Sequence, residues 1–301
     1  MASGYTWIMR TAPDPDVRTI ESALDRGFDA LSPELQRAAR WLRQNGAVVA
    51  LHSMRQSARL AGVAPATMTR LAQRLGFDGF ESLRLPYARR LAGAGGATAA
   101  RRRPSGLDAA LTALNATQRA HVGAVLAHNP PARLQALADA MLAAPRVCFF
   151  GQRISHAVAF QLQYGYGLLA PNGSLLTDLG GTLTDQLAQL GPQTLLVAVS
   201  QSPYTRSAVE VVARASRQGA PVAALTDSPL SPIARDARHC LLFGGGADAL
   251  LHSTCGAVAL AETLLSVVAH QGGAAVRQHW AARQRQLGAD RAYWEAPKEP
   301  R

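Results

Sequence analysis

Apolar side chains in the first third of the chain recur every three to four residues, which is the spacing of one helix face. One such stripe follows Ser32 and Pro33, a pair that favours a helix start because a proline in the first turn sacrifices no helical hydrogen bond. The stripe consists of Leu35, Ala38, Ala39 and Leu42. The pattern predicts an all-helical region over residues 17–91.

Two short helices joined by a tight turn at Gly62 are predicted within residues 53–75, SMRQSARLAGVAPATMTRLAQRL. The second helix begins at Pro65, and the two are expected to pack through Leu60, Val63, Met68, Leu71 and Leu75. The polar side chains predicted to face outward are Thr67, Thr69, Arg70, Gln73 and Arg74. Such a pair is typical of a helix-turn-helix, whose Arg, Gln and Thr side chains contact bases or phosphates. An ordinary helical hairpin with a solvated face is the alternative.

From residue 107 onward, short apolar runs alternate with helical segments. Strands are predicted at residues 146–150, 174–177, 195–200, 222–226 and 240–243. Helices are predicted at residues 107–128, 132–143, 155–169, 182–190, 205–218 and 252–270. Apolar runs without polar alternation predict a parallel sheet that is buried on both faces. The expected fold class is therefore α/β: an all-helical domain, then a doubly wound domain with a parallel sheet flanked by helices.

Charge supports the DNA-binding interpretation of the helix pair. The net charge is +11, and residues 1–106 hold 16 arginines and 8 acidic residues, so most of the excess lies beside the helix-turn-helix pattern. Concentrated positive charge of this kind is typical of a module that contacts DNA. The length of 301 residues allows two domains or one large one, and an apolar fraction of 48% argues against general disorder.

The composition along the chain predicts five parts. Residues 1–16 are expected to form a flexible tail, 17–92 the helix-turn-helix domain, 93–106 a linker, 107–275 the α/β domain and 276–301 a C-terminal helical tail. The linker prediction depends on the small, glycine-rich run GAGGATAARRRP.

Metal, membrane and export signals are weak. Cys148, Cys240 and Cys255 lie far apart without a metal-binding spacing, so we expect buried thiols in a reducing cytoplasm, no metal and no cofactor. The N-terminus lacks the long apolar core of a secretory signal. Residues 250–269 are apolar, but His252 and Glu262 interrupt them, which favours a core or dimer-interface helix over a membrane span.

Two junctions between a predicted strand and the following helix are rich in hydrogen-bond donors, at residues 151–155 and 200–205. The carboxyl ends of parallel strands lie along one sheet edge, where helix N-termini direct free N–H groups toward a ligand. The junctions therefore predict an anion site suited to a phosphate, unless their hydroxyls only cap the helices. Thr226, Asp227 and Ser228 form a weaker third junction.

The run VAPATMTRLAQRLGFDGFESLR makes residues 20–91 resemble the N-terminal domain of the RpiR/MurR family of transcriptional regulators. Residues from about 116 to 272 resemble the sugar isomerase (SIS) domain that follows it in that family. The resemblance implies that a Ser-x-Ser-Gly-x-Thr loop holds the phosphate of a phosphosugar. This chain matches the loop at Ser200, Ser202 and Thr205, and also at Gln201, which several sugar-phosphate SIS enzymes share.

The first junction in the family is Gly-x-Gly-x-Ser, which the chain matches at Gly151 and Ser155. Two residues depart from the family patterns, because Arg153 and Pro203 replace glycines. Both replacements are expected to remove the freedom for close ligand approach or positive φ. Arg153 would instead add a cation to the phosphate pocket or fill it, and Pro203 with Tyr204 would narrow the sugar site or stack on a different ligand.

Pattern, charge and resemblance together imply a cytoplasmic bacterial transcription factor rather than an enzyme. It is expected to bind double-stranded operator DNA as a homodimer or homotetramer and to sense a phosphorylated sugar. The predicted groove contacts are Thr67, Thr69 and Arg70, and the predicted DNA-phosphate contacts are Arg55, Arg59 and Arg74.

Two other functions fit the same sequence. A phosphosugar isomerase with an accessory helical domain needs a base beside the reacting carbon, for which the available residues are Glu210, Glu262, His156 and His252. No pairing of an acid with a base stands out among them. A pure interaction protein, with the SIS fold as a dimerisation scaffold and a filled pocket, is the second alternative.

Overall fold

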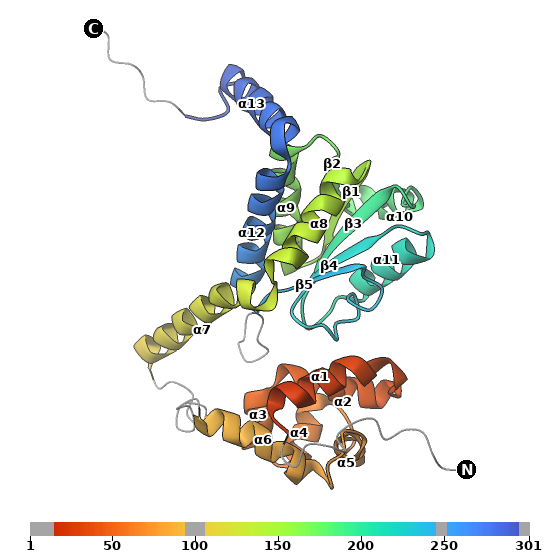
Figure 1. The fold of residues 1–301 in the computed structure, drawn as a ribbon, viewed down its shortest axis with the longest axis vertical. Coiled ribbons are helices and arrows are strands. Elements are labelled where there is room, and N and C mark those ends of the chain that lie inside the picture. Colours follow the sequence, from red (N-terminus) through yellow and green to blue (C-terminus); the bar gives the residue numbers. More distant parts are fainter. Residues whose placement is uncertain (1–14, 94–105, 245–251, 295–301) are drawn as a thin grey trace. The chain divides into compact units, whose positions relative to one another are not determined.

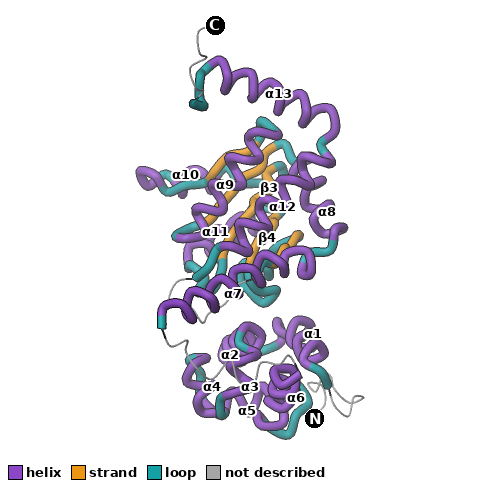
Figure 2. Tube along the Cα trace, turned by 90° about the vertical axis from the view of Figure 1, so that its left-hand side faces the viewer, coloured by secondary structure: helices purple, strands orange, loops and turns teal. Residues whose placement is uncertain are grey.

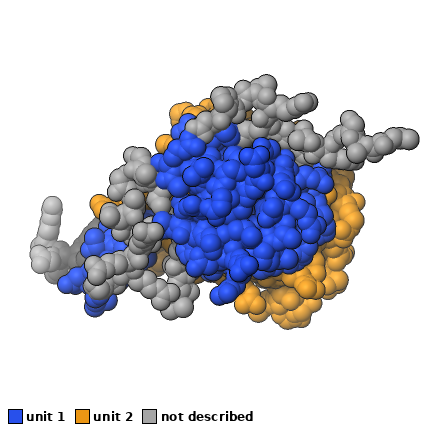
Figure 3. All heavy atoms as spheres, turned by 90° about the horizontal axis from the view of Figure 1, so that it is seen from below, with its two compact units in different colours: residues 1–117, 228–230, 246–252 blue, residues 118–227, 231–245, 253–301 orange. Residues whose placement is uncertain are grey.

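The computed structural model describes residues 15–93, 106–244 and 252–294 (Figure 1). The chain divides into two compact units, coloured separately in Figure 3. Residues up to 117 belong to the first unit and most later residues to the second. Most of the predicted tail and linker, at residues 1–14 and 94–105, lies outside the described residues.

The first unit is helical in its described part. Its elements are α1 (Val17–Gly27), η1 (Phe28–Ala30), α2 (Pro33–Gln44), α3 (Gly46–Leu51), α4 (Met54–Ala61), α5 (Pro65–Arg74) and α6 (Phe80–Gly93). Their apolar stripes meet in one core, in which the largest fully buried side chains include Ile20, Leu24, Leu42, Met68, Leu71 and Leu83. The predicted all-helical region is thereby confirmed.

The second unit contains a five-stranded sheet in the order β2-β1-β3-β4-β5, with every neighbouring pair parallel. Its strands are β1 (Arg146–Gly151), β2 (Gly173–Leu175), β3 (Thr194–Ser200), β4 (Val222–Thr226) and β5 (His239–Leu242). All seven residues of β3 and all five of β4 are buried, as expected for a sheet that helices cover on both faces.

Helices lie on both faces of this sheet, so the predicted doubly wound architecture is confirmed (Figure 2). On one face, α8 (Pro131–Ala143), α9 (Ile154–Leu169) and α12 (Cys255–Gln271) pack on Val147, Phe149 and their neighbours. On the other face, α10 (Leu183–Ala188) and α11 (Arg206–Arg217) pack on Cys148, Phe150 and their neighbours. Successive strand residues supply opposite faces because side chains alternate along a strand.

Further helices are α7 (Leu107–His128) before the sheet, the short η3 (Leu179–Gly181) after β2, and α13 (Gly273–Ala289) after α12. Asn129, directly after α7, is buried and joins the helix to β5. Its side-chain amide donates to the Leu242 carbonyl at 2.6 Å and accepts the Leu242 N–H at 2.7 Å. Among the helices described here, α12 included, none has the length and apolar character needed to cross a membrane.

Candidate functional site

The strand order places a crevice at the carboxyl ends of β1 and β3. From β1 the chain passes to β2 on one side and then returns to β3 on the other, so the direction of winding reverses between β1 and β3. Ligands of open α/β sheets bind at such a reversal. The register pairs Gly151 with Val199 and Ser200 with Thr226, so the loops after β1, β3 and β4 begin along the same edge. The two predicted junctions are therefore neighbours.

The loop after β1 turns sharply into α9. A Cβ on Gly151 would lie 2.5 Å from the carbonyl oxygen of Ser155, so only glycine fits there. Arg153, the N-cap residue of α9, has φ 53° and ψ −128°. The expectation that an arginine here excludes positive φ is wrong, because the residue adopts the backbone conformation that the family's glycine would favour. Its side chain is exposed, whereas Ser155 is buried.

The loop after β3 holds most of the predicted phosphate contacts. Ser200 and Gln201 are buried, and Ser202 and Thr205 are half-buried. Thr205 is the N-cap residue of α11, but its side chain makes no capping hydrogen bond, and neither does that of Arg153 at α9. Simple helix capping therefore does not account for these polar residues.

Side-chain hydrogen bonds connect these loops to one another. The Ser207 hydroxyl, in the first turn of α11, donates to Oε1 of Gln152 in the loop after β1. Asp227, at the end of β4, accepts the Ser202 backbone N–H at 3.1 Å and the Tyr204 hydroxyl at 2.9 Å. Burial raises the pKa of the Asp227 carboxyl, and these hydrogen bonds oppose that shift.

A cavity of about 190 Å³ opens beside this edge, at the ends of β1 and β2. Its polar lining comes from Gln152, Arg153, His156, Thr177 and Asp178. This volume is below the roughly 300–1,000 Å³ typical of drug-sized ligands, so the cavity suits a small molecule. Of the predicted ligand residues, this cavity contains Arg153 alone. Ser155 lies in the first turn of α9, and Ser200, Gln201, Ser202 and Thr205 belong to the adjacent β3 loop.

The sequence did not single out Thr177 and Asp178. They follow β2, the strand that pairs with β1, so their position after a strand was the available signal. His156, considered only as a base, lines the same cavity, and its Nδ1 lies 3.3 Å from the Gly151 carbonyl oxygen. Two more of the four candidate bases, Glu210 on α11 and Glu262 on α12, are exposed.

The predicted helix-turn-helix is formed by α4 and α5. Ser53 and Gln56 form a capping box at the start of α4: the Gln56 N–H donates to the Ser53 hydroxyl, and Gln56 Oε1 accepts the Ser53 N–H at 3.0 Å. Gly62 ends the helix with φ 64°, in the left-handed region that glycine favours. Pro65 begins α5, as predicted.

The structure places most predicted DNA contacts on the surface of this pair. Arg55, Arg59 and Arg70 are exposed, and Thr69 and Arg74 are half-buried. Two expectations are wrong. Thr67 is only 6% exposed because it lies four residues before Leu71 on the core face of α5, and Leu60 is 55% exposed because the smaller Ala58 and Ala61 supply the contact face of α4.

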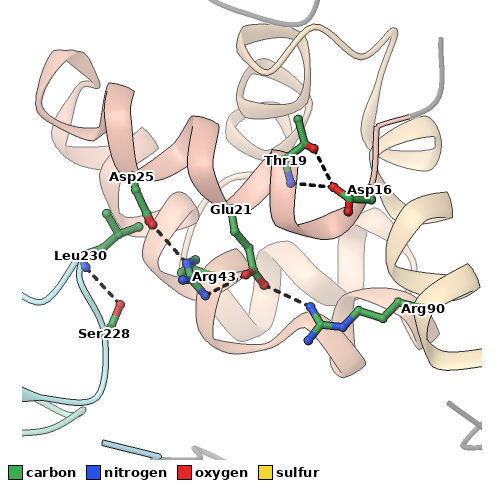
Figure 4. Close-up of polar contacts among 8 residues, drawn as sticks. All are labelled: Asp16, Thr19, Glu21, Asp25, Arg43, Arg90, Ser228 and Leu230. Carbon is green, nitrogen blue, oxygen red and sulfur yellow. Dashed lines mark hydrogen bonds and ion pairs between the residues drawn. The ribbon is translucent and has the colours of Figure 1, made fainter. Parts of the chain in front are cut away.

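Other arginines of this unit are engaged in ion pairs within the fold (Figure 4). Arg43 lies between Glu21 and Asp25, at 3.3 and 3.4 Å, and Arg90 lies 3.4 Å from the second oxygen of Glu21. Burial raises the pKa of Asp25, while Arg43 lowers it. Since Arg43 and Arg90 have these acidic partners, they add less to the DNA-attracting charge than the exposed arginines of α4 and α5.

Comparisons with known proteins agree with this two-part organisation. Residues 20–94 match the model described as "Helix-turn-helix domain, rpiR family", and residues 140–268 match that of the SIS domain. No curated protein sequence resembles the chain at a significant level.

Solved structures also resemble the chain. The RpiR transcription factor from Sphaerobacter thermophilus (its sugar isomerase domain) is 30% identical, with a TM-score of 0.55, over 60% of this chain and 98% of that one. The Vibrio vulnificus NanR protein complexed with ManNAc-6P has a TM-score of 0.57 over 91% of this chain and 100% of that one, and at 17% identity it supports the fold. The two domain matches and the 30% identity show that the chain belongs to the RpiR family of helix-turn-helix transcriptional regulators.

Proposed function

We propose that the protein binds operator DNA through α4 and α5 and that its SIS domain senses a phosphorylated sugar or a related metabolite. The observation that carries the ligand half is the meeting of the β1 and β3 loops at the point where the sheet reverses its winding. The DNA half is supported by the family match and by the exposed arginines of the helix pair.

The anion of the ligand would bind at the β3 loop. Ser200, Gln201, Ser202 and Thr205 supply hydroxyl and amide groups there, and the N-terminus of α11 adds a favourable dipole. Ser155 and the Arg153 guanidinium would complete the site from the β1 loop. The sugar would extend into the adjacent cavity, where Thr177 and Asp178 offer hydrogen bonds to hydroxyl groups. The ligand of the NanR protein, ManNAc-6P, is of this chemical class.

Regulation would follow if the ligand binds better to one arrangement of the DNA-binding domains than to another. A homodimer or homotetramer in the cytoplasm would place two helix-turn-helix pairs on half-sites about one or two helical turns apart. A coupling of about 1–3 kcal/mol is sufficient to change the affinity for the operator about 5- to 150-fold. The protein would act by binding rather than by catalysis.

Selection of bound fragments from genomic DNA, followed by fluorescence anisotropy, tests the DNA half. Arg70→Ala is expected to weaken specific binding by about 1–3 kcal/mol if the arginine contacts a base. Arg26→Ala is the matched control, because Arg26 is exposed on α1 and donates to Ser22 within its own helix. Failure of the wild-type protein to bind any promoter fragment at low salt would overturn the proposal.

Thermal-shift titration with hexose and pentose phosphates tests the ligand half, because a ligand that binds only the folded protein raises its melting temperature. The absence of stabilisation by every sugar phosphate would favour a scaffold with a filled pocket. Turnover of any of them would instead support the isomerase alternative, for which His156 in the cavity wall is the residue to test.

A further inference from the structure

Asp227 is a half-buried carboxylate, and its hydrogen-bond donors among the described residues are neutral groups. Its Oδ2 accepts the backbone N–H of Ser202 at 3.1 Å, and its Oδ1 accepts the hydroxyls of Tyr204 at 2.9 Å and Thr226 at 3.3 Å. Two of these donors belong to the β3 loop, on either side of Pro203. One side chain at the end of β4 therefore fastens the loop at two points.

Burial of a carboxylate is unfavourable unless hydrogen bonds replace the lost water, so this arrangement needs the loop donors in place. Conversely, the two donors from the loop, Ser202 and Tyr204, lie within three residues of Thr205 at the start of α11. Their hydrogen bonds to Asp227 therefore restrain the segment that leads into this helix. The loop that would bind the anion is thus hydrogen-bonded to a residue that directly follows a different strand, β4.

We propose that Asp227 is a positioning residue that holds the β3–α11 loop in the shape required for anion binding. The identity of the ligand rests on the proposed function, whereas the effect of Asp227 on the loop does not. Asp227 acts through Ser202 and Tyr204 and needs no contact with the ligand. Tyr204 then has a defined role, since its hydroxyl ties the residue after Pro203 to the same carboxylate.

Hydrogen exchange of the ligand-free full-length protein, measured by mass spectrometry over residues 200–205, tests the positioning directly. Asp227→Ala is expected to accelerate exchange at Ser202 about tenfold, the factor for losing one hydrogen bond to a charged acceptor. Asp227→Asn is expected to restore most of the protection, because its side-chain oxygen still accepts an N–H. Asp185→Ala, an exposed carboxylate on α10, is the matched control and should leave exchange of this segment unchanged.

Unchanged exchange at Ser202 in Asp227→Ala would overturn the proposal. Equal acceleration throughout the sheet unit would also overturn it, because that result indicates a general loss of stability. If Asp227→Ala does not fold, Tyr204→Phe decides, since it removes one of the two loop ties and should accelerate exchange by a smaller factor in this segment alone.

Isothermal titration with inorganic phosphate as the probe adds the functional readout. Asp227→Ala is expected to weaken phosphate binding about tenfold, with Asp227→Asn at or above wild-type affinity because it keeps the geometry and removes a negative charge. Tighter binding by Asp227→Ala than by wild type would overturn positioning and identify the carboxylate as a competitor of the anion. Should wild type bind neither phosphate nor any sugar phosphate, the proposed function fails while the exchange experiment still decides the role of Asp227.

Discussion

Arg153 keeps a backbone conformation, φ 53° and ψ −128°, that side chains with a Cβ rarely adopt. Such a conformation costs about 1–3 kcal/mol in a non-glycine residue. Glycine relieves this strain, although it adds about 0.4–1 kcal/mol of conformational entropy to the unfolded chain. Comparison of Arg153→Gly with Arg153→Ala isolates the backbone effect, because both variants lack the guanidinium and only alanine keeps the Cβ.

We expect Arg153→Gly to be more stable than Arg153→Ala by roughly 1–2 kcal/mol, the difference between these two effects. In a domain of this size about 2–4 °C of melting temperature corresponds to 1 kcal/mol, so the glycine variant should melt about 2–8 °C higher. Scanning calorimetry of the full-length protein measures the difference in the transition of the sheet unit. A glycine variant that melts at or below the alanine variant would refute the reasoning.

The same pair of variants separates stability from recognition. If the guanidinium contacts the anion, both substitutions should weaken binding of a hexose 6-phosphate by a similar factor, about tenfold for one charge-assisted hydrogen bond. Arg153→Gly would then be more stable than Arg153→Ala, while both variants bind the sugar phosphate less tightly than wild type, the pattern expected where strain is kept for function. Unchanged sugar-phosphate affinity in both variants would remove Arg153 from the site and leave the strain argument intact.

Three further outcomes are expected. Gly151→Ala should destabilise the sheet unit by about 1–3 kcal/mol, because its Cβ would lie 2.5 Å from the Ser155 carbonyl oxygen. Urea denaturation measures this loss, with Gly191→Ala as the control because its Cβ would meet open space; equal stability of the two variants would contradict the geometry. Ser53→Ala should lower the stability of the helical unit by about 1 kcal/mol through loss of the capping box, seen as a lower unfolding midpoint, and an unchanged midpoint would count against it. Burial raises the folded pKa of Asp227 above the ordinary 3.8, so the folded protein keeps this proton to higher pH than the unfolded chain does. The stability of wild type should therefore fall relative to that of Asp227→Asn as pH rises above 3.8; a pH-independent difference in urea titrations would show that the pKa of this carboxyl is not raised.

Much of the fold was predictable from the sequence because its signals are local. The strand predicted at residues 222–226 coincides with β4, and the helix predicted at 107–128 coincides with α7. By contrast, β2 begins at Gly173, one residue before the predicted start. Because glycine has no side chain, Tyr166 can pack closely against this position while Gly173 pairs with β1. That boundary depends on contacts that are remote in sequence.

The candidate site was predictable only in part for the same reason. The loop after β3 carries its signal within six residues, so the sequence alone locates it. The tie from Asp227, the bridge from Gln152 to Ser207 and the cavity wall at Thr177 join several strand ends, and only the sheet order brings them together. Thr67 was misplaced because a polar residue type was given more weight than its position on the helix.

The loops proposed to bind the ligand extend from largely buried strands, and in β3 every residue is buried. A scaffold of this kind tolerates sequence change at its rim while its interior stays the same. Effector preference can therefore diverge among descendants of one ancestor by exchanging a few rim residues, such as Arg153 or Pro203, without refolding the domain. The same separation makes this sheet a practical template for engineering sensors that respond to other small anions.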